Sequence, residues 1–141
     1  MLGDTAGRVY AVLGQQNPKQ LAAVDTAKAA GTYTVGTIPA GDTQEGITGF
    51  TISVDTRDTT IAHTHRILLY VTDGTHTYYL ASGFCDAGSP FQQTVVFPAP
   101  LRMGQLLNPA VTHTVNIQIA NILGTGTCDY NVAVDYLANV I

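Results

Sequence analysis

The chain has 141 residues, enough for one domain with a sizeable core, and 45% of them are hydrophobic, which excludes the composition of a disordered chain. Only 11% are charged, compared with roughly 25% in an average domain, the formal net charge is −4, and the six basic residues are scattered, so we expect no nucleic-acid partner. The longest apolar stretches, such as Ile67–Val71, are too short to span a bilayer, so we also expect no membrane partner.

Residues 1–30 differ in pattern from the rest of the chain. A short apolar run, Val9–Leu13, is followed by a polar loop and then by the alanine-rich stretch Gln20–Ala30. β-branched residues and the lack of a capping pattern argue against a helix in this stretch. We interpret residues 1–30 as an extended N-terminal arm with short strands, ahead of a β-sandwich domain over residues 31–141. An ordinary first strand of the sandwich is the alternative.

From residue 31 onward the sequence repeatedly shows the signatures of β-strands. Apolar and polar residues alternate with a period of two, as in strands with one buried face, and Pro, Gly and Asp-Gly turn signals separate the runs. The expected strands are Thr32–Val35, Phe50–Val54, Arg66–Thr72, Thr75–Ala81, Gln92–Phe97, Val111–Leu123 and Cys128–Val140. This spacing predicts an all-β fold, an antiparallel β-sandwich with a jelly-roll-like arrangement.

The Asp73-Gly74 pair is the clearest hairpin signal, because both central residues of a two-residue turn need positive φ. Such a turn predicts the cross-strand pairs Thr72–Thr75, Val71–His76 and Leu69–Tyr78. Within Arg66–Thr72, apolar residues occupy both the odd-numbered and the even-numbered positions. Both faces of this strand would therefore be apolar, so we expect a central strand that is covered on both faces. Leu101–Pro109 is expected to be a long connection that exposes apolar residues.

Three histidines form the most suggestive pattern for chemistry. His63 and His65 are two residues apart, so on a strand both side chains project to one face. His113 shares its parity with Val115 and Ile117, which places it on the core side of its own strand. Three imidazoles that converge inside a sandwich would bind zinc, iron or nickel.

This pattern resembles the cupin family of metal-binding jelly rolls. His63-Thr64-His65 and Gly74 fit the first motif of that family, and the second is loosely echoed by Gly104, Pro109, His113 and Asn116. The chain departs from the family where Leu69 and Tyr70 replace the glutamate ligand and Val111 replaces an inner glycine. We therefore expect no metal site and no cofactor. A cupin-like metal protein that uses His63, His65 and His113 is the alternative from a different functional class.

No motif indicates an enzyme. No serine stands in a nucleophile-elbow context, and Cys85 has no activating base beside it in the sequence. Cys85 and Cys128 are too few for a disulfide scaffold, so we expect two reduced, buried thiols, although the two could pair. Catalytic residues are therefore not assigned.

Three segments carry a resemblance over about residues 31–140: Tyr33–Gly41, the alternating Phe50–Val54 and the hairpin Arg66–Ala81. In style they resemble the small β-sandwich virion proteins of tailed bacteriophages, above all head decoration (cement) proteins. This resemblance implies a non-enzymatic homo-oligomer, such as a trimer, clamped over junctions of a major capsid protein. It also implies a place in the virion, assembled in the host cytoplasm. A tail or head–tail connector component is the alternative within the same class.

The low charge independently favours an assembly protein. Contact surfaces avoid unpaired charges because removing them from water is costly. An alanine-rich N-terminal arm can add a strand to a neighbour's sheet. The apolar residues of Leu101–Leu107 would otherwise face water. We expect a protein that associates with copies of itself without metal.

Overall fold

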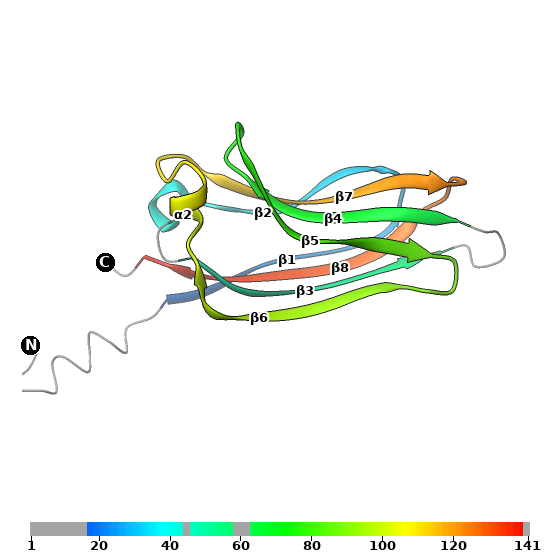
Figure 1. Cartoon of the computed structure of the whole chain (residues 1–141), viewed down its shortest axis with the longest axis horizontal. Helices are drawn as coiled ribbons and strands as arrows, with labels where there is room; N and C mark the ends of the chain where they lie inside the picture. Colours follow the sequence, from blue (N-terminus) through cyan, green and yellow to red (C-terminus); the bar gives the residue numbers. More distant parts are fainter. Residues whose placement is uncertain (1–16, 44–45, 58–62, 140–141) are drawn as a thin grey trace, which may run out of the picture.

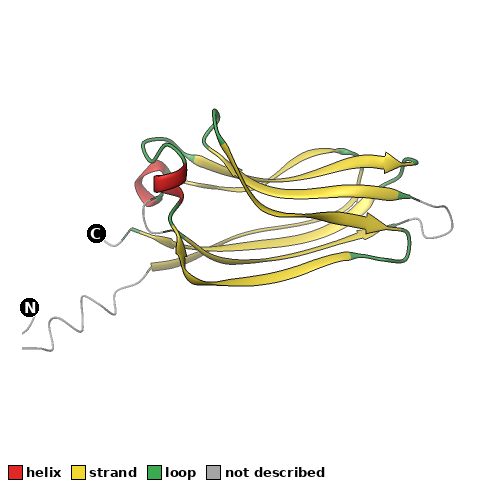
Figure 2. Cartoon of the chain, viewed as in Figure 1, coloured by secondary structure: helices red, strands yellow, loops and turns green. Residues whose placement is uncertain are grey.

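The fold is described by a computed structural model over residues 17–43, 46–57 and 63–139. Two antiparallel four-stranded sheets pack face to face, so the predicted all-β sandwich is confirmed (Figure 2). Sheet A has the strand order β1 (Asn17–Lys28), β8 (Cys128–Ala138), β3 (Ile47–Thr56) and β6 (Phe91–Leu101). Sheet B has the order β2 (Gly31–Ile38), β7 (His113–Leu123), β4 (Thr64–Thr72) and β5 (Thr77–Asp86).

The chain changes sheet at almost every connection, and the hairpin between β4 and β5 is the exception (Figure 1). Eight strands in this order form a jelly roll, which is built from two interlocked Greek keys. Two short helical turns, η1 (Ala40–Asp42) and α2 (Met103–Leu106), lie at the same end of the sandwich as the β4–β5 hairpin loop (Figure 1).

The core lies between the two sheets and follows the predicted alternation. Every second residue of the inner strands is buried, except at the end of β7 after Ile119, and the largest fully buried apolar side chains include Ile52, Val54, Ile67, Leu69, Val115, Ile117 and Ile119. The intervening residues are mostly polar or charged, and their side chains are partly or fully exposed. This pattern is that of strands with one buried face.

The N-terminal region is part of the sandwich over its described residues. β1 pairs with β8 from Asn17–Ala138 to Lys28–Cys128, and it forms an edge of sheet A. Residues 17–28 therefore match the first-strand alternative rather than a separate arm. The predicted boundary after residue 30 lies between β1 and β2 of the same sandwich. The apolar run Val9–Leu13 lies outside the described residues.

The β4–β5 hairpin is present, but its predicted register is wrong. The observed pairs are Thr72–Thr77, Val71–Tyr78, Tyr70–Tyr79 and Leu69–Ala81, with a β-bulge after Leu69. The loop spans four residues, Asp73–His76, because the Asp73 carboxylate accepts hydrogen bonds from the backbone N–H groups of Thr75 (2.8 Å) and His76 (2.6 Å). Gly74 has φ of +96°, as the turn signal predicted.

Two other expectations need correction. β4 is an inner strand, but Leu68 and Tyr70 on its outer face are only partly buried, so within this chain the strand is covered on one face. The connection after β6 is not an exposed apolar stretch, since Met103 and Leu107 are buried and Leu106 remains exposed. The α2 turn folds the side chains of Met103 and Leu107 into the core at the end of the sandwich.

Candidate functional site

His63 and His65 lie together at one end of the sandwich, where β4 begins. His65 is fully buried, His63 is 7% exposed, and their ring centroids are 6.1 Å apart. Neither ring nitrogen of His65 has a hydrogen-bond partner among the described residues, although Asn121 stands opposite it on β7. Burial lowers the pKa of the His65 imidazole, because the charged form loses its hydration. Burial thus favours the neutral form of the His65 imidazole.

His113 lies at the other end of the sandwich. It is the first residue of β7 and fully buried, and its Nε2 atom is 2.7 Å from the backbone carbonyl oxygen of Asn108. That contact satisfies one ring nitrogen through a backbone acceptor, as expected for an ordinary core histidine.

The three histidines therefore share the core side of the sheet but do not converge. His65 pairs with Asn121 on β7, and His113 lies eight residues away along the same strand, about 26 Å at the rise of an extended chain. Among the described residues, no group of three or more His, Cys, Asp and Glu side chains is arranged to hold a metal ion. The cupin-like ligand set of His63, His65 and His113 is not brought together.

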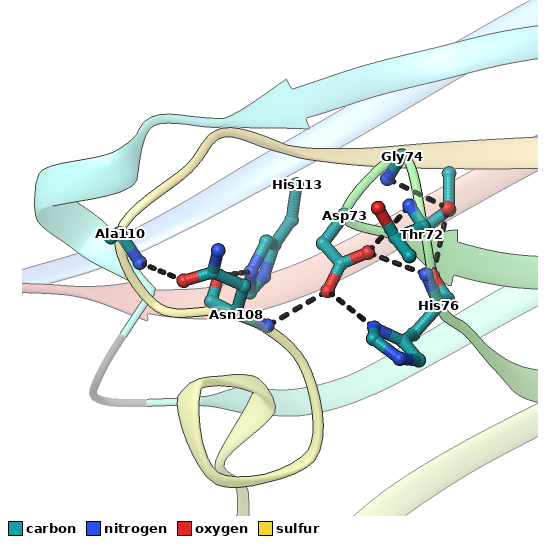
Figure 3. A network of polar contacts seen from close by, with 8 residues as sticks. Thr72, Asp73, Gly74, His76, Asn108, Ala110 and His113 are labelled. Atoms are coloured by element: carbon teal, nitrogen blue, oxygen red, sulfur yellow. Dashed lines mark hydrogen bonds and ion pairs between the residues drawn. The ribbon is translucent and has the colours of Figure 1, made fainter.

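A polar network at the His113 end joins two loops (Figure 3). The Asp73 carboxylate accepts hydrogen bonds from the backbone N–H groups of Thr75, His76 and Asn108, the last at 2.8 Å. These bonds hold the pKa of Asp73 well below its usual range, since they stabilise the carboxylate. The side chain is 1% exposed, so the network is a structural link between loops rather than an open site.

The sequence did not indicate this network. Asp-Gly signalled a turn, but nothing in the local pattern shows that Asp73 would also bind Asn108, which is 35 positions further along the chain. The inward direction of both cysteines, in contrast, follows from strand parity. Cys85 shares its parity with the buried Ala81, and Cys128 shares its parity with Tyr130. Both thiols are free and fully buried, as expected.

A shallow hollow on the outside of sheet A holds about 230 Å³ and is lined in part by Asp25, Asp55 and Asp129. Two of these carboxylates already have partners. Asp129 accepts a hydrogen bond from the backbone N–H of Ala27 (2.9 Å), and Asp25 accepts one from the Tyr130 hydroxyl (2.9 Å). Both hydrogen bonds link β1 to β8.

The exposed apolar side chains on the molecular surface bear more directly on function than the hollow on sheet A does. Several large apolar side chains are more than half exposed: Val96 (81%), Val24 (67%), Phe84 (59%), Tyr79 (58%), Ile122 (57%) and Leu123 (55%). They occur on both sheets, and Val24 and Val96 lie on the two edge strands of sheet A. On sheet B, Phe84 stands across from Arg66 on the neighbouring strand.

No helix in the described ranges has the length and apolar character needed to cross a membrane. No protein-family model matches the chain, and no curated protein matches it. Any likeness to known proteins therefore comes from solved structures.

Three such likenesses involve structures of different kinds. A chain in the structure of the infectious bursal disease virus Gx strain has a TM-score of 0.55 and 12% identity, covering 86% of this chain and 32% of its own length. A subunit of Bacillus endospore appendages, described as disulfide-linked pili, has a TM-score of 0.45 and 18% identity over 99% of both chains. The Yersinia pseudotuberculosis-derived mitogen has a TM-score of 0.35 and 10% identity, covering 88% of this chain and 90% of its own.

These values limit what the likenesses mean. The identity to the viral chain is too low to show more than a shared β-sandwich fold, and this chain spans about a third of that chain's length. The other two structures have lower TM-scores, 0.45 and 0.35. The comparisons therefore show the fold of this chain.

Proposed function

We propose that this chain is a non-enzymatic structural subunit that assembles with copies of itself. The observation that carries this proposal is a surface with very few charges on which large apolar side chains are more than half exposed. A monomer in water gains nothing from this arrangement, whereas burial of apolar surface drives association at about 25 cal/mol per Å². The rigid jelly roll supplies the shape, and its outer surfaces supply the contacts.

Within this role we propose a component of a phage particle, with a head decoration protein as the first candidate. Its partners would be further copies of the chain, as a trimer, and a major capsid protein, and its location would be the virion. The sequence resemblance to tailed-phage virion proteins supports this assignment. A chain from the structure of a virus particle also has the same fold. A tail or head–tail connector component is the second candidate.

Substitutions at the exposed apolar positions test the proposal. We expect Phe84→Asp or Val96→Asp to lower the molar mass measured by light scattering behind a sizing column, because an added charge would have to be desolvated in the contact. Gln105→Glu is the matched control, since it adds a charge at an exposed polar position of α2 and should keep the wild-type mass. A wild-type mass for both Asp variants would contradict the assignment of these side chains to contacts.

Electron microscopy of the purified assembly separates the two candidates. Closed rings of three subunits support the decoration protein, because a closed symmetric assembly can sit over a capsid junction. Open helical filaments contradict the decoration assignment and favour a tail component, since a contact whose rotation does not close generates a filament.

A further inference from the structure

Two buried thiols from different sheets adjoin the same residue, Thr56, at the end of the sandwich where β4 begins. Cys85 is near the end of β5 in sheet B, and Cys128 is the first residue of β8 in sheet A. The Thr56 hydroxyl is 3.2 Å from Sγ of Cys85, and Thr56 stands directly opposite Cys128 on the neighbouring strand. The Cys85 thiol also donates a hydrogen bond to the backbone carbonyl oxygen of Val54 on the same strand as Thr56 (3.3 Å). Both buried thiols therefore adjoin Thr56, one from each sheet.

Buried imidazoles accompany the two thiols. His65 stands directly opposite Cys85 in the β4–β5 ladder, a position that brings Cβ atoms to about 4.5–5.5 Å. Its ring nitrogens have no hydrogen-bond partner within the described ranges, and a buried polar atom without a partner calls for an explanation. The basic nitrogen of a neutral imidazole can accept a thiol proton, and the thiolate is the form of cysteine that reacts with disulfides.

We propose that Cys85 and Cys128 form a disulfide that links the two sheets when the protein meets a low-molecular-weight disulfide such as oxidised glutathione. The Cys85 thiolate attacks one sulfur of oxidised glutathione, breaks its S–S bond and releases one glutathione thiolate. Cys128 then attacks the Cys85 sulfur of this mixed disulfide and releases the second glutathione. Two protein thiols are oxidised, one glutathione disulfide is reduced, and the two cysteine protons end on the released thiols.

The order of attack follows from the surroundings of the two sulfur atoms. The neighbouring Cys128 thiol lowers the pKa of Cys85, and the neighbouring Cys85 thiol together with burial raises the pKa of Cys128. Cys85 also lies near the end of β5, which is an edge strand with one neighbour in its sheet. Local opening at a strand end needs less free energy than global unfolding, so a small disulfide reaches Cys85 first.

The bond would change the stability of the subunit. It would join β5 to β8 and close the chain between residues 85 and 128, which restricts the unfolded state and leaves the native contacts in place. A subunit that folds with reduced thiols would then be locked after its transfer to an oxidising medium.

The test uses the full chain, purified with both thiols reduced and then incubated with oxidised glutathione. We expect the intact mass to fall by about 2 Da, free thiols measured after unfolding to fall from two to none, and the melting temperature to rise by roughly 5–10 °C. A non-reduced digest should join the peptides that contain Cys85 and Cys128. Retention of both thiols, stable glutathione adducts or bridges between chains would overturn the proposal.

Serine variants test the order of attack. Cys128→Ser should trap glutathione on Cys85, because the second sulfur is missing, whereas Cys85→Ser should react much more slowly with glutathione. The reverse preference would contradict the assignment of Cys85 as the attacking sulfur. The mass and thiol count of the unmodified chain decide the main proposal even where a serine variant does not fold.

Discussion

The side chain of Asp73 connects two loops that are far apart in the sequence. Its carboxylate closes the β4–β5 loop through Thr75 and His76 and holds the loop before β7 through the N–H of Asn108. The carbonyl of Asn108 in turn contacts the His113 ring, as Figure 3 shows. One buried charge thus organises an end of the sandwich, since charged acceptors make stronger hydrogen bonds than neutral ones.

We expect Asp73→Asn to lower the melting temperature at neutral pH by several degrees, because an amide replaces a carboxylate that accepts several N–H groups. The folded-state pKa of Asp73 lies below its unfolded value, so this stabilisation is complete above the unfolded pKa and is lost as pH falls below it. Thermal melts at neutral pH and near pH 2 should show the difference between the two proteins shrinking at the lower pH.

Asp135→Asn is the control, since Asp135 is exposed and its carboxylate accepts a hydrogen bond from the Gln20 amide. Two outcomes would contradict the account of the loop. One is an equal loss of melting temperature in both variants, and the other is a loss for Asp73→Asn that does not change with pH.

The positions of the histidines give a prediction about metals. His65 and His113 lie at opposite ends of sheet B, so chelators should leave the melting temperature of the protein unchanged. Melts with and without EDTA check this expectation. Near-stoichiometric zinc, iron or nickel in protein purified without a histidine tag would show that it is wrong.

At the scale of elements, the approach of β3 and β6 depends on a glycine. Gly49 is buried in β3, and a Cβ atom there would lie 2.5 Å from the carbonyl oxygen of Val95 on β6. The register of β3 against both neighbours also shifts between Ile47 and Gly49. Because the clashing atom belongs to the backbone, a side chain could be accommodated only if the two strands moved apart.

We expect Gly49→Ala to lower the free energy of unfolding by about 2–3 kcal/mol, the scale of overpacking in a tight core. Gly41→Ala is the control, since a Cβ at Gly41 meets nothing within 4 Å, and it should change stability by less than about 0.5 kcal/mol. Urea denaturation of both variants measures the difference. Equal stabilities would contradict the close packing of β3 on β6.

Strands and burial could be predicted from the sequence because they depend on local alternation. The same alternation placed His113 on the core side and His63 and His65 on one shared face, and all three are buried. It could not place them along the sheet, because β4 and β7 run antiparallel and the direction of pairing is a property of the whole topology. The hairpin register was missed for a similar reason, since the Asp73 carboxylate makes a four-residue loop in place of a two-residue turn.

At the scale of the whole molecule, the jelly roll explains the unusual composition. Two sheets that cover each other need apolar residues at every second position, and the remaining outward positions hold mostly threonine, small residues and amides. The exposed edge strands β1 and β6 carry Val24 and Val96, and β6 also carries Pro98 and Pro100. Proline lacks an N–H group, so an edge strand can accept it without losing a ladder bond.

The molar mass of the unmodified chain in isolation tests the structural role most directly. Multi-angle light scattering behind a sizing column, over a dilution series up to high micromolar concentration, should show a discrete oligomer that dissociates on dilution. Apolar contacts of this kind hold subunits together in proportion to the area that they bury. A monodisperse monomer of 14.9 kDa at every concentration would contradict the account.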